Sequence, residues 1–114
     1  MTAATELTLE RWVEVCEYHD LLPERGVAAL LDDLQVAVFR LADGSLRAVD
    51  NLDPCSGAYV LSRGIVGTSG HLNTVASPMH KQRFDLDTGS CLDADASVSC
   101  YPVRLVGESV QIAA

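Results

Sequence analysis

The chain has 114 residues, 48% hydrophobic and 21% charged, with a formal net charge of −8 at pH 7, which predicts one soluble globular domain. The acidic charge and the scattered basic residues exclude a nucleic-acid partner, because such binding relies on Lys and Arg at phosphates. No apolar run reaches the roughly 18 residues that span a bilayer, and residues 1–10 lack the pattern of a leader, so we expect a cytoplasmic protein without a membrane partner.

Short runs of strand-forming residues, separated by turn residues, recur along the chain and predict an all-β fold. The expected strands are residues 12–16, 27–31, 34–41, 46–49, 71–76, 82–85, 98–106 and 109–113. Asp43-Gly44 predicts a tight hairpin between the third and fourth strands. Residues 50–70 contain several Gly and Pro and predict a long loop. Helical periodicity is weak, and residues 5–13 form either a helical turn or the lead-in to the first strand.

The four cysteines give no metal or redox pattern. Cys16, Cys55, Cys91 and Cys100 include no Cys-x-x-Cys pair, so neither a zinc ribbon nor a thioredoxin-like site is indicated. In a reducing compartment we expect all four to be free thiols.

The most specific motif is Ser77-Pro78-Met79-His80-Lys81, followed by Phe84-Asp85-Leu86 and Thr88-Gly89. It resembles the second ligand loop of a Rieske iron–sulfur domain, in which Cys-Pro-x-His leads into Phe-Asp-Leu-x-Thr-Gly. Such domains bind a two-iron cluster through two Cys on one iron and two His on the other. The resemblance places Ser77 at a cysteine position and His80 at a histidine position.

Residues 51–58 resemble the first ligand loop, Cys-Pro-His-x-Gly-Ala. This similarity places Asp53 at the other cysteine position and Cys55 at the other histidine position. A carboxylate and a hydroxyl then replace the thiolates that a two-iron cluster selects. We therefore expect no iron–sulfur cluster.

Two further interpretations concern the same positions. In one, Asp53, Cys55 and His80 ligate a single Zn²⁺, with Ser77 or water as the fourth ligand. In the other, Asp53 and Ser77 accept backbone N–H hydrogen bonds ahead of the prolines, and His80 is partly exposed. We favour the second, in which this chain holds neither a metal nor a cofactor.

Beyond the two loops, the chain resembles the small subunits of cytoplasmic NAD(P)H-dependent assimilatory nitrite reductases. The similar segments are residues 49–51, 53–54, 56–58, 60–67, 76–86, 88–89 and 101–104. The resemblance implies a Rieske-like antiparallel β-sandwich that occupies residues 1–114 as one domain, with a loop-rich, degenerate cluster-binding subdomain at about 51–89. Cys55 departs from the family, where a bulky apolar residue is expected.

The resemblance also implies a function. The chain would be an accessory subunit that supports reduction of nitrite to ammonium in nitrate assimilation. Its partner would be the large subunit, which carries FAD, an iron–sulfur cluster and sirohaem. No catalytic residue is carried over to this chain. The alternative is a Rieske-type ferredoxin component that delivers electrons to an oxygenase.

A few other residues are candidates for the interface or the core. Arg63 and Lys81 lie at or beside the two loops, and either pair with a partner's carboxylates or remain solvated charges. Tyr59 is either an interface anchor or a core residue, and we favour the core. Trp12 and Phe39 are expected in the core.

Overall fold

The computed structural model describes residues 12–113, which form nine β-strands and two short 3-10 helices. The elements are β1 (Trp12–Glu17), η1 (Tyr18–Asp20), β2 (Arg25–Leu31), β3 (Leu34–Arg40), β4 (Leu46–Asp50), η2 (Leu61–Arg63), β5 (Ile65–Ser69), β6 (Leu72–Ala76), β7 (Arg83–Asp85), β8 (Val103–Val106) and β9 (Ser109–Ala113). No helix among these residues is long and apolar enough to cross a membrane. The all-β prediction is confirmed.

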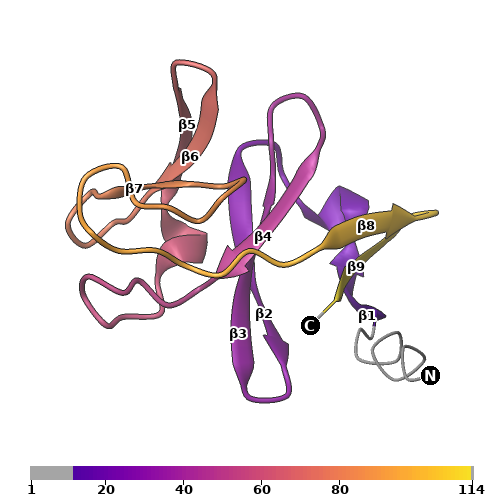
Figure 1. Cartoon of the computed structure of the whole chain (residues 1–114). Coiled ribbons are helices and arrows are strands. Elements are labelled where there is room, and N and C mark those ends of the chain that lie inside the picture. Colours follow the sequence, from indigo (N-terminus) through magenta and orange to yellow (C-terminus); the bar gives the residue numbers. More distant parts are fainter. Residues whose placement is uncertain (1–11, 114) are drawn as a thin grey trace, which may run out of the picture.

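The strands form three antiparallel sheets of three strands each, ordered β1-β9-β8, β2-β3-β4 and β5-β6-β7. In Figure 1 the β2-β3-β4 sheet lies in the middle, with β1-β9-β8 on the right and β5-β6-β7 on the left. In the central sheet, Val38 of β3 stands opposite Val27 of β2 and Ala48 of β4. The predicted hairpin at Asp43-Gly44 joins β3 to β4, as expected.

Strand β3 is buried on both faces, because side chains of a strand alternate between the two sides of the sheet. Val36 and Val38 belong to a hydrophobic cluster with residues of β9, and Ala37 and Phe39 belong to a second cluster with residues of β6 and β7. All four side chains are fully buried. Their uninterrupted apolar run therefore belongs to a central strand between two hydrophobic layers.

Three expectations need correction. The loop predicted for residues 50–70 ends early, because Ile65–Ser69 pair with β6 as strand β5. The strand predicted for 98–106 begins only at Val103, and before it a single bridge joins Cys100 to Val49. Trp12 is only half-buried, with the Arg104 guanidinium 4.1 Å from its ring centroid. Phe39 is in the core as predicted. Of residues 5–13, positions 5–11 lie outside the described residues, and the last two belong to β1.

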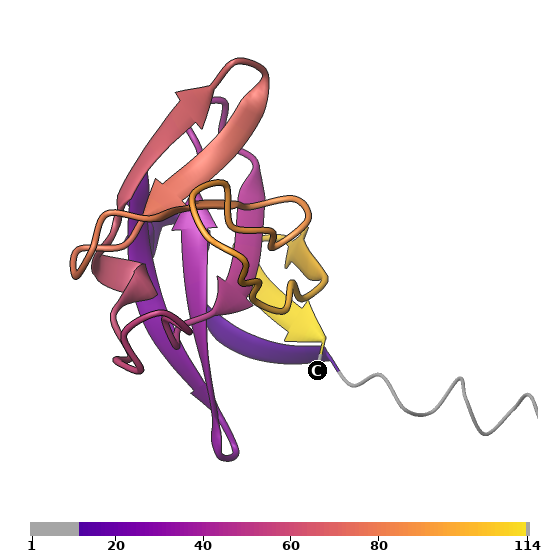
Figure 2. The ribbon, with the colours of Figure 1, turned by 60° about the vertical axis from the view of Figure 1, so that its left-hand side comes forward.

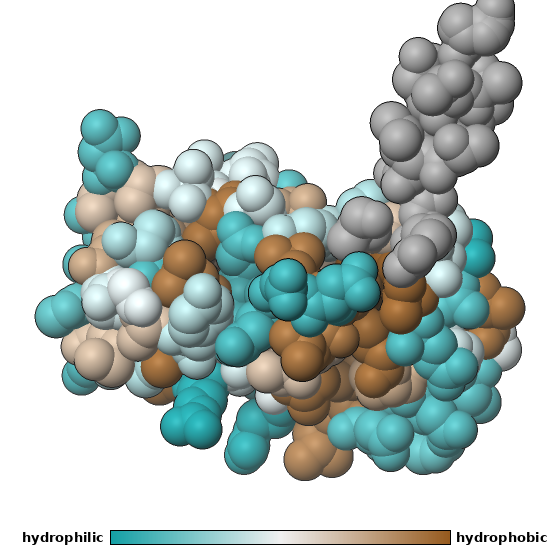
Figure 3. All heavy atoms as spheres, turned by 90° about the horizontal axis from the view of Figure 1, so that it is seen from below, coloured by the Kyte–Doolittle hydropathy of each residue, from teal (hydrophilic) through white to brown (hydrophobic). Residues whose placement is uncertain are grey.

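Turning the molecule brings the β5-β6-β7 end forward (Figure 2), where η2 packs against β2 and β3. The face seen from below carries its hydrophobic side chains mainly in the right-hand half, on the side of the β1-β9-β8 sheet (Figure 3). The two loops identified in the sequence belong to the left-hand end, and they are the candidate site.

Candidate functional site

The two loops are joined by one buried hydrogen bond. Asp53 lies in the loop after β4, and Ser77 follows directly after β6. The Ser77 hydroxyl donates to Oδ2 of Asp53 at 2.6 Å. Both residues are almost inaccessible, with exposed fractions of 0% for Asp53 and 1% for Ser77. The fold therefore brings together the two positions that the motif assigned to cysteines.

Asp53 is held by its own loop as well as by Ser77. Its Oδ1 accepts the backbone N–H of Cys55 at 2.8 Å, and its Oδ2 accepts the Ser56 hydroxyl at 3.0 Å. Burial favours the neutral acid, but the hydrogen bonds from Ser77, Cys55 and Ser56 outweigh it and lower the pKa of Asp53. The carboxylate is thus charged at neutral pH and is bound to donors from both loops.

Ser77 anchors the second loop in the same way. Its backbone carbonyl accepts the N–H of Lys81 at 2.9 Å, and its hydroxyl accepts the N–H of Met79 at 3.2 Å. Lys81 has φ of 65°, a left-handed conformation that favours glycine. The tip formed by Met79, His80 and Lys81 is exposed. The expectation that Asp53 and Ser77 accept backbone N–H groups is confirmed.

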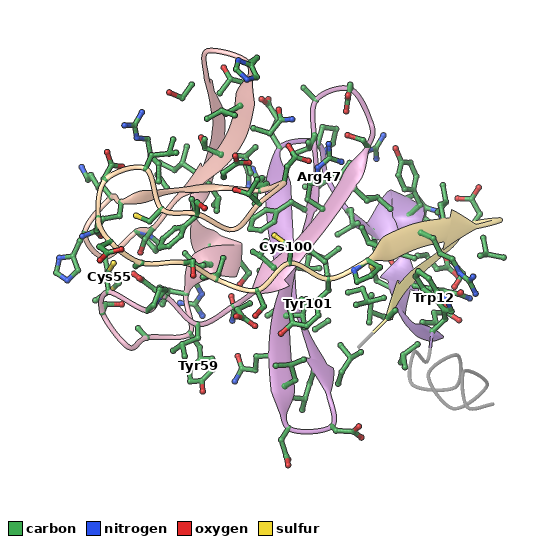
Figure 4. The ribbon with its side chains drawn as sticks, in the orientation of Figure 1. Trp12, Arg47, Cys55, Tyr59, Cys100 and Tyr101 are labelled. Carbon is green, nitrogen blue, oxygen red and sulfur yellow. The ribbon has the colours of Figure 1, made fainter. Side chains whose placement is uncertain are left out.

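The structure does not bring the three residues of the zinc interpretation together. Cys55 and His80 are both exposed, and within residues 12–113 no three His, Cys, Asp or Glu side chains are arranged to hold a metal ion. Cys55 lies at the outer end of its loop (Figure 4). Desolvation first, and then the Asp53 carboxylate and the Cys91 thiol, raise the pKa of Cys55.

Two polar residues to which the sequence assigned no role, Asp50 and Asn51, make hydrogen bonds where β4 ends. Oδ1 of Asp50 accepts the Tyr101 hydroxyl at 2.5 Å, beside β4 (Figure 4). Asn51 is 2% exposed, and its Oδ1 accepts the backbone N–H of Ser62 at 2.7 Å. Asn51 thereby ties η2 to the end of β4. In the sequence, these two residues are only a polar pair that follows an apolar run, a pattern too common to indicate a structural role.

The residues proposed for an interface are accessible. Arg63 and Lys81 are exposed, and no hydrogen bond or ion pair engages either side chain among the described residues. Tyr59 is 55% exposed, so the prediction that it fills the core is wrong. Leu61, two residues later, is fully buried and takes that place.

The fold and the two loops together identify the class to which the protein belongs. The molecule has three antiparallel sheets, two hydrophobic clusters and two loops that meet at one end. The chain belongs to the Rieske-like [2Fe-2S] domain family, whose pattern matches residues 11–113. This confirms the fold expected from the two loops.

Within that family the chain is homologous to small subunits of nitrite reductase. It is 42% identical over 106 residues to the nitrite reductase (NADH) small subunit of Escherichia coli K12, covering 91% of this chain and 98% of that one. A crystal structure from Mycobacterium tuberculosis, described as an NADH-dependent nitrite reductase small subunit, superposes with a TM-score of 0.88 at 53% identity, covering 92% of this chain and 96% of that one.

Two other comparisons bear on function. The nitrite reductase [NAD(P)H] large subunit of Klebsiella oxytoca contains a segment 36% identical over 102 residues, which covers 89% of this chain and 11% of that protein. The ferredoxin component of the naphthalene 1,2-dioxygenase system of Pseudomonas aeruginosa is more distant, at 28% identity over 107 residues, or 90% of this chain and 95% of that protein. The nitrite reductase homology is therefore better supported than the ferredoxin alternative.

The residues of this chain do not fit the cluster for which the family is named. Two-iron clusters of this kind need two cysteine thiolates on one iron. Here those positions are Asp53 and Ser77, which hydrogen-bond directly to each other in the buried space between the loops. Hard oxygen donors are a poor replacement for thiolates, and the Asp53 oxygens are already bound.

Proposed function

We propose that this chain is the small subunit of a cytoplasmic NAD(P)H-dependent nitrite reductase and acts by association with a large subunit. It is a single domain whose former cluster-binding subdomain, at about residues 51–89, carries no redox centre. FAD, an iron–sulfur cluster and sirohaem reside on the large subunit, and the complex reduces nitrite to ammonium in nitrate assimilation.

One observation carries this proposal. The Klebsiella oxytoca large subunit contains a domain similar to nearly the whole of this chain. The same domain is thus part of the large subunit in one organism and a separate small subunit in another. We expect it to occupy the same place in both complexes. Association is then the property that both arrangements share.

The bond between Ser77 and Asp53 supports the same reading. A carrier of electrons requires a redox centre, and the buried space between the two loops is closed by hydrogen bonds. The loops keep the shape of a Rieske-like end without its cluster. We assign this end, with Arg63 and Lys81, to the interface with the large subunit.

The conformation of Lys81 also supports this assignment. A left-handed backbone costs a residue other than glycine about 1 kcal/mol. Strain of this kind is commonly retained at functional positions. An exposed cation held in this way is suited to meeting a carboxylate of a partner.

The experiment is reconstitution of the complex from separately purified subunits of the same organism. We expect the two chains to co-elute in size-exclusion chromatography, and the complex to reduce nitrite with NADH or NADPH faster than the large subunit alone. A large subunit that is equally active alone and never binds this chain would refute the proposal. Iron and acid-labile sulfide near two per chain, after anaerobic purification, would favour the ferredoxin function instead.

A further inference from the structure

The cations of this acidic chain fall into two groups. Of its eight Lys and Arg residues, Arg11 lies outside the described part. Four are engaged within the chain by ion pairs, hydrogen bonds or ring contacts: Arg40, Arg47, Arg83 and Arg104. The side chains of Arg25, Arg63 and Lys81 have no such partner among the described residues. The free cations are therefore those available to another molecule.

Two of these three cations line the same groove. Two adjoining hollows of about 320 and 360 Å³ lie between the start of β2, η2 and the start of β5, and both are lined by Arg25 and Arg63. Asp20 lines one hollow and Glu24 the other. Because the two hollows share the same two guanidinium groups, the groove as a whole has two guanidinium groups and two carboxylates, whereas the chain has a net charge of −8.

The groove also exposes apolar side chains and a free strand edge. Leu22 lines one hollow and is 61% exposed, and Ile65 lines the other and is 76% exposed. Strand β5 pairs only with β6, so no strand covers its outer edge in the part of the chain that the structure describes. An exposed edge of this kind offers backbone hydrogen-bonding groups to an added strand.

From this arrangement we propose that the groove lined by Arg25 and Arg63 binds an extended acidic segment of the large subunit. Carboxylates of that segment pair with the two guanidinium groups, whose fork geometry suits bidentate binding. Its apolar side chains cover Leu22 and Ile65, and its backbone adds to the edge of β5. The inference rests on the proposed function and specifies the surface and the chemistry of the partner.

Charge decides whether the groove holds an acidic segment of the large subunit or a second copy of this chain. A chain with a net charge of −8 repels its own copies over most of its surface. An acidic peptide segment pairs with the two free guanidinium groups in the groove without bringing a whole acidic domain close to it. The groove therefore suits a segment of a larger partner.

The test measures the affinity of the purified large subunit for variants of this chain. Arg25→Gln is the main variant, because Arg25 lies on β2, away from the two motif loops. Arg104→Gln is the matched control, since it removes the same charge from β8 at the opposite end of the molecule (Figure 1). The urea midpoint of each variant verifies that it folds.

We expect Arg25→Gln to weaken binding by about tenfold, and Arg25→Gln with Arg63→Gln by more, while Arg104→Gln changes it less than about twofold. Arg25→Lys retains part of the affinity, because it keeps the charge but loses the fork. In hydrogen exchange, amides of Ile65–Ser69 become protected in the complex and those of Val103–Val106 do not.

Three outcomes would overturn the inference. If wild type binds the large subunit and Arg25→Gln binds equally well, the groove is not the site, and the proposed function survives. A dimer of this chain that Arg25→Gln dissociates would assign the groove to self-association. If wild type does not bind at all, both the inference and the proposed function are wrong.

Discussion

Replacing Ser77 with Ala removes the hydroxyl that joins the two loops. The hydroxyl donates to Oδ2 of Asp53 at 2.6 Å and accepts the Met79 N–H at 3.2 Å. Because Asp53 is charged and fully buried, bulk water does not replace the lost donor. A hydrogen bond to a charged group contributes about 1.5–3 kcal/mol, so we expect Ser77→Ala to lower the free energy of unfolding by about 2 kcal/mol at neutral pH.

This loss depends on pH in a defined direction. The pKa of Asp53 is lower in the folded chain than in the unfolded one, since the hydrogen bonds outweigh burial. Such a carboxyl stabilises the fold above its unfolded pKa of about 3.9, and this stabilisation disappears as pH falls through the folded value. The difference between wild type and Ser77→Ala is therefore largest near neutral pH and shrinks below about pH 4.

Urea unfolding of wild type and variant at several pH values measures both effects. With a slope of about 2 kcal/mol per molar urea, the expected loss moves the midpoint by about 1 M. Ser56→Ala is the matched control, because its hydroxyl donates to the same oxygen at 3.0 Å from a less buried position. We expect it to cost about 1 kcal/mol. A Ser77→Ala loss below about 0.5 kcal/mol, or one that is equal at acid and neutral pH, would refute the reasoning.

Three more predictions concern neighbouring positions. Burial and the Asp50 carboxylate acceptor raise the pKa of Tyr101 to about 12. An ultraviolet titration of tyrosine ionisation should therefore lose the component near that pH in Tyr101→Phe. We expect the same variant to lower the free energy of unfolding by about 1.5 kcal/mol. Gly89→Ala should lower the free energy of unfolding by about 3 kcal/mol, because φ is 84° and the added Cβ would lie 2.0 Å from the Val98 carbonyl oxygen. Gly70→Ala is the control, since its φ is 63° but its Cβ would meet open space, and it should cost about 1 kcal/mol. Equal losses of stability in urea unfolding would contradict this. Lys81→Gly should raise stability by about 0.5–1 kcal/mol and weaken binding of the large subunit, and unchanged stability would show that its left-handed backbone is unstrained.

The sequence predicted most strands correctly, because their signals are local. Alternation defines β1, and Asp43-Gly44 fixes the hairpin between β3 and β4. Strand β5 was missed because Ile65–Ser69 contains a glycine and little alternation, and it becomes a strand only by pairing with β6. The burial of Phe39 could be predicted from its place in an apolar strand. The exposure of Tyr59 could not be predicted, because it depends on Leu61 rather than Tyr59 turning into the core.

By itself, the sequence determined the family and the loss of thiolate ligands, since both depend on which residues occupy the two motif loops. It also indicated that Asp53 and Ser77 are hydrogen-bonded loop residues. Only the tertiary structure showed that they bond to each other, because they are separated by 24 positions and meet only when the loop after β4 lies against the end of β6. The same holds for Arg25 and Arg63, which share a groove because η2 folds back onto β2. Local patterns determine which side chains a chain offers, and long-range packing decides which of them act together.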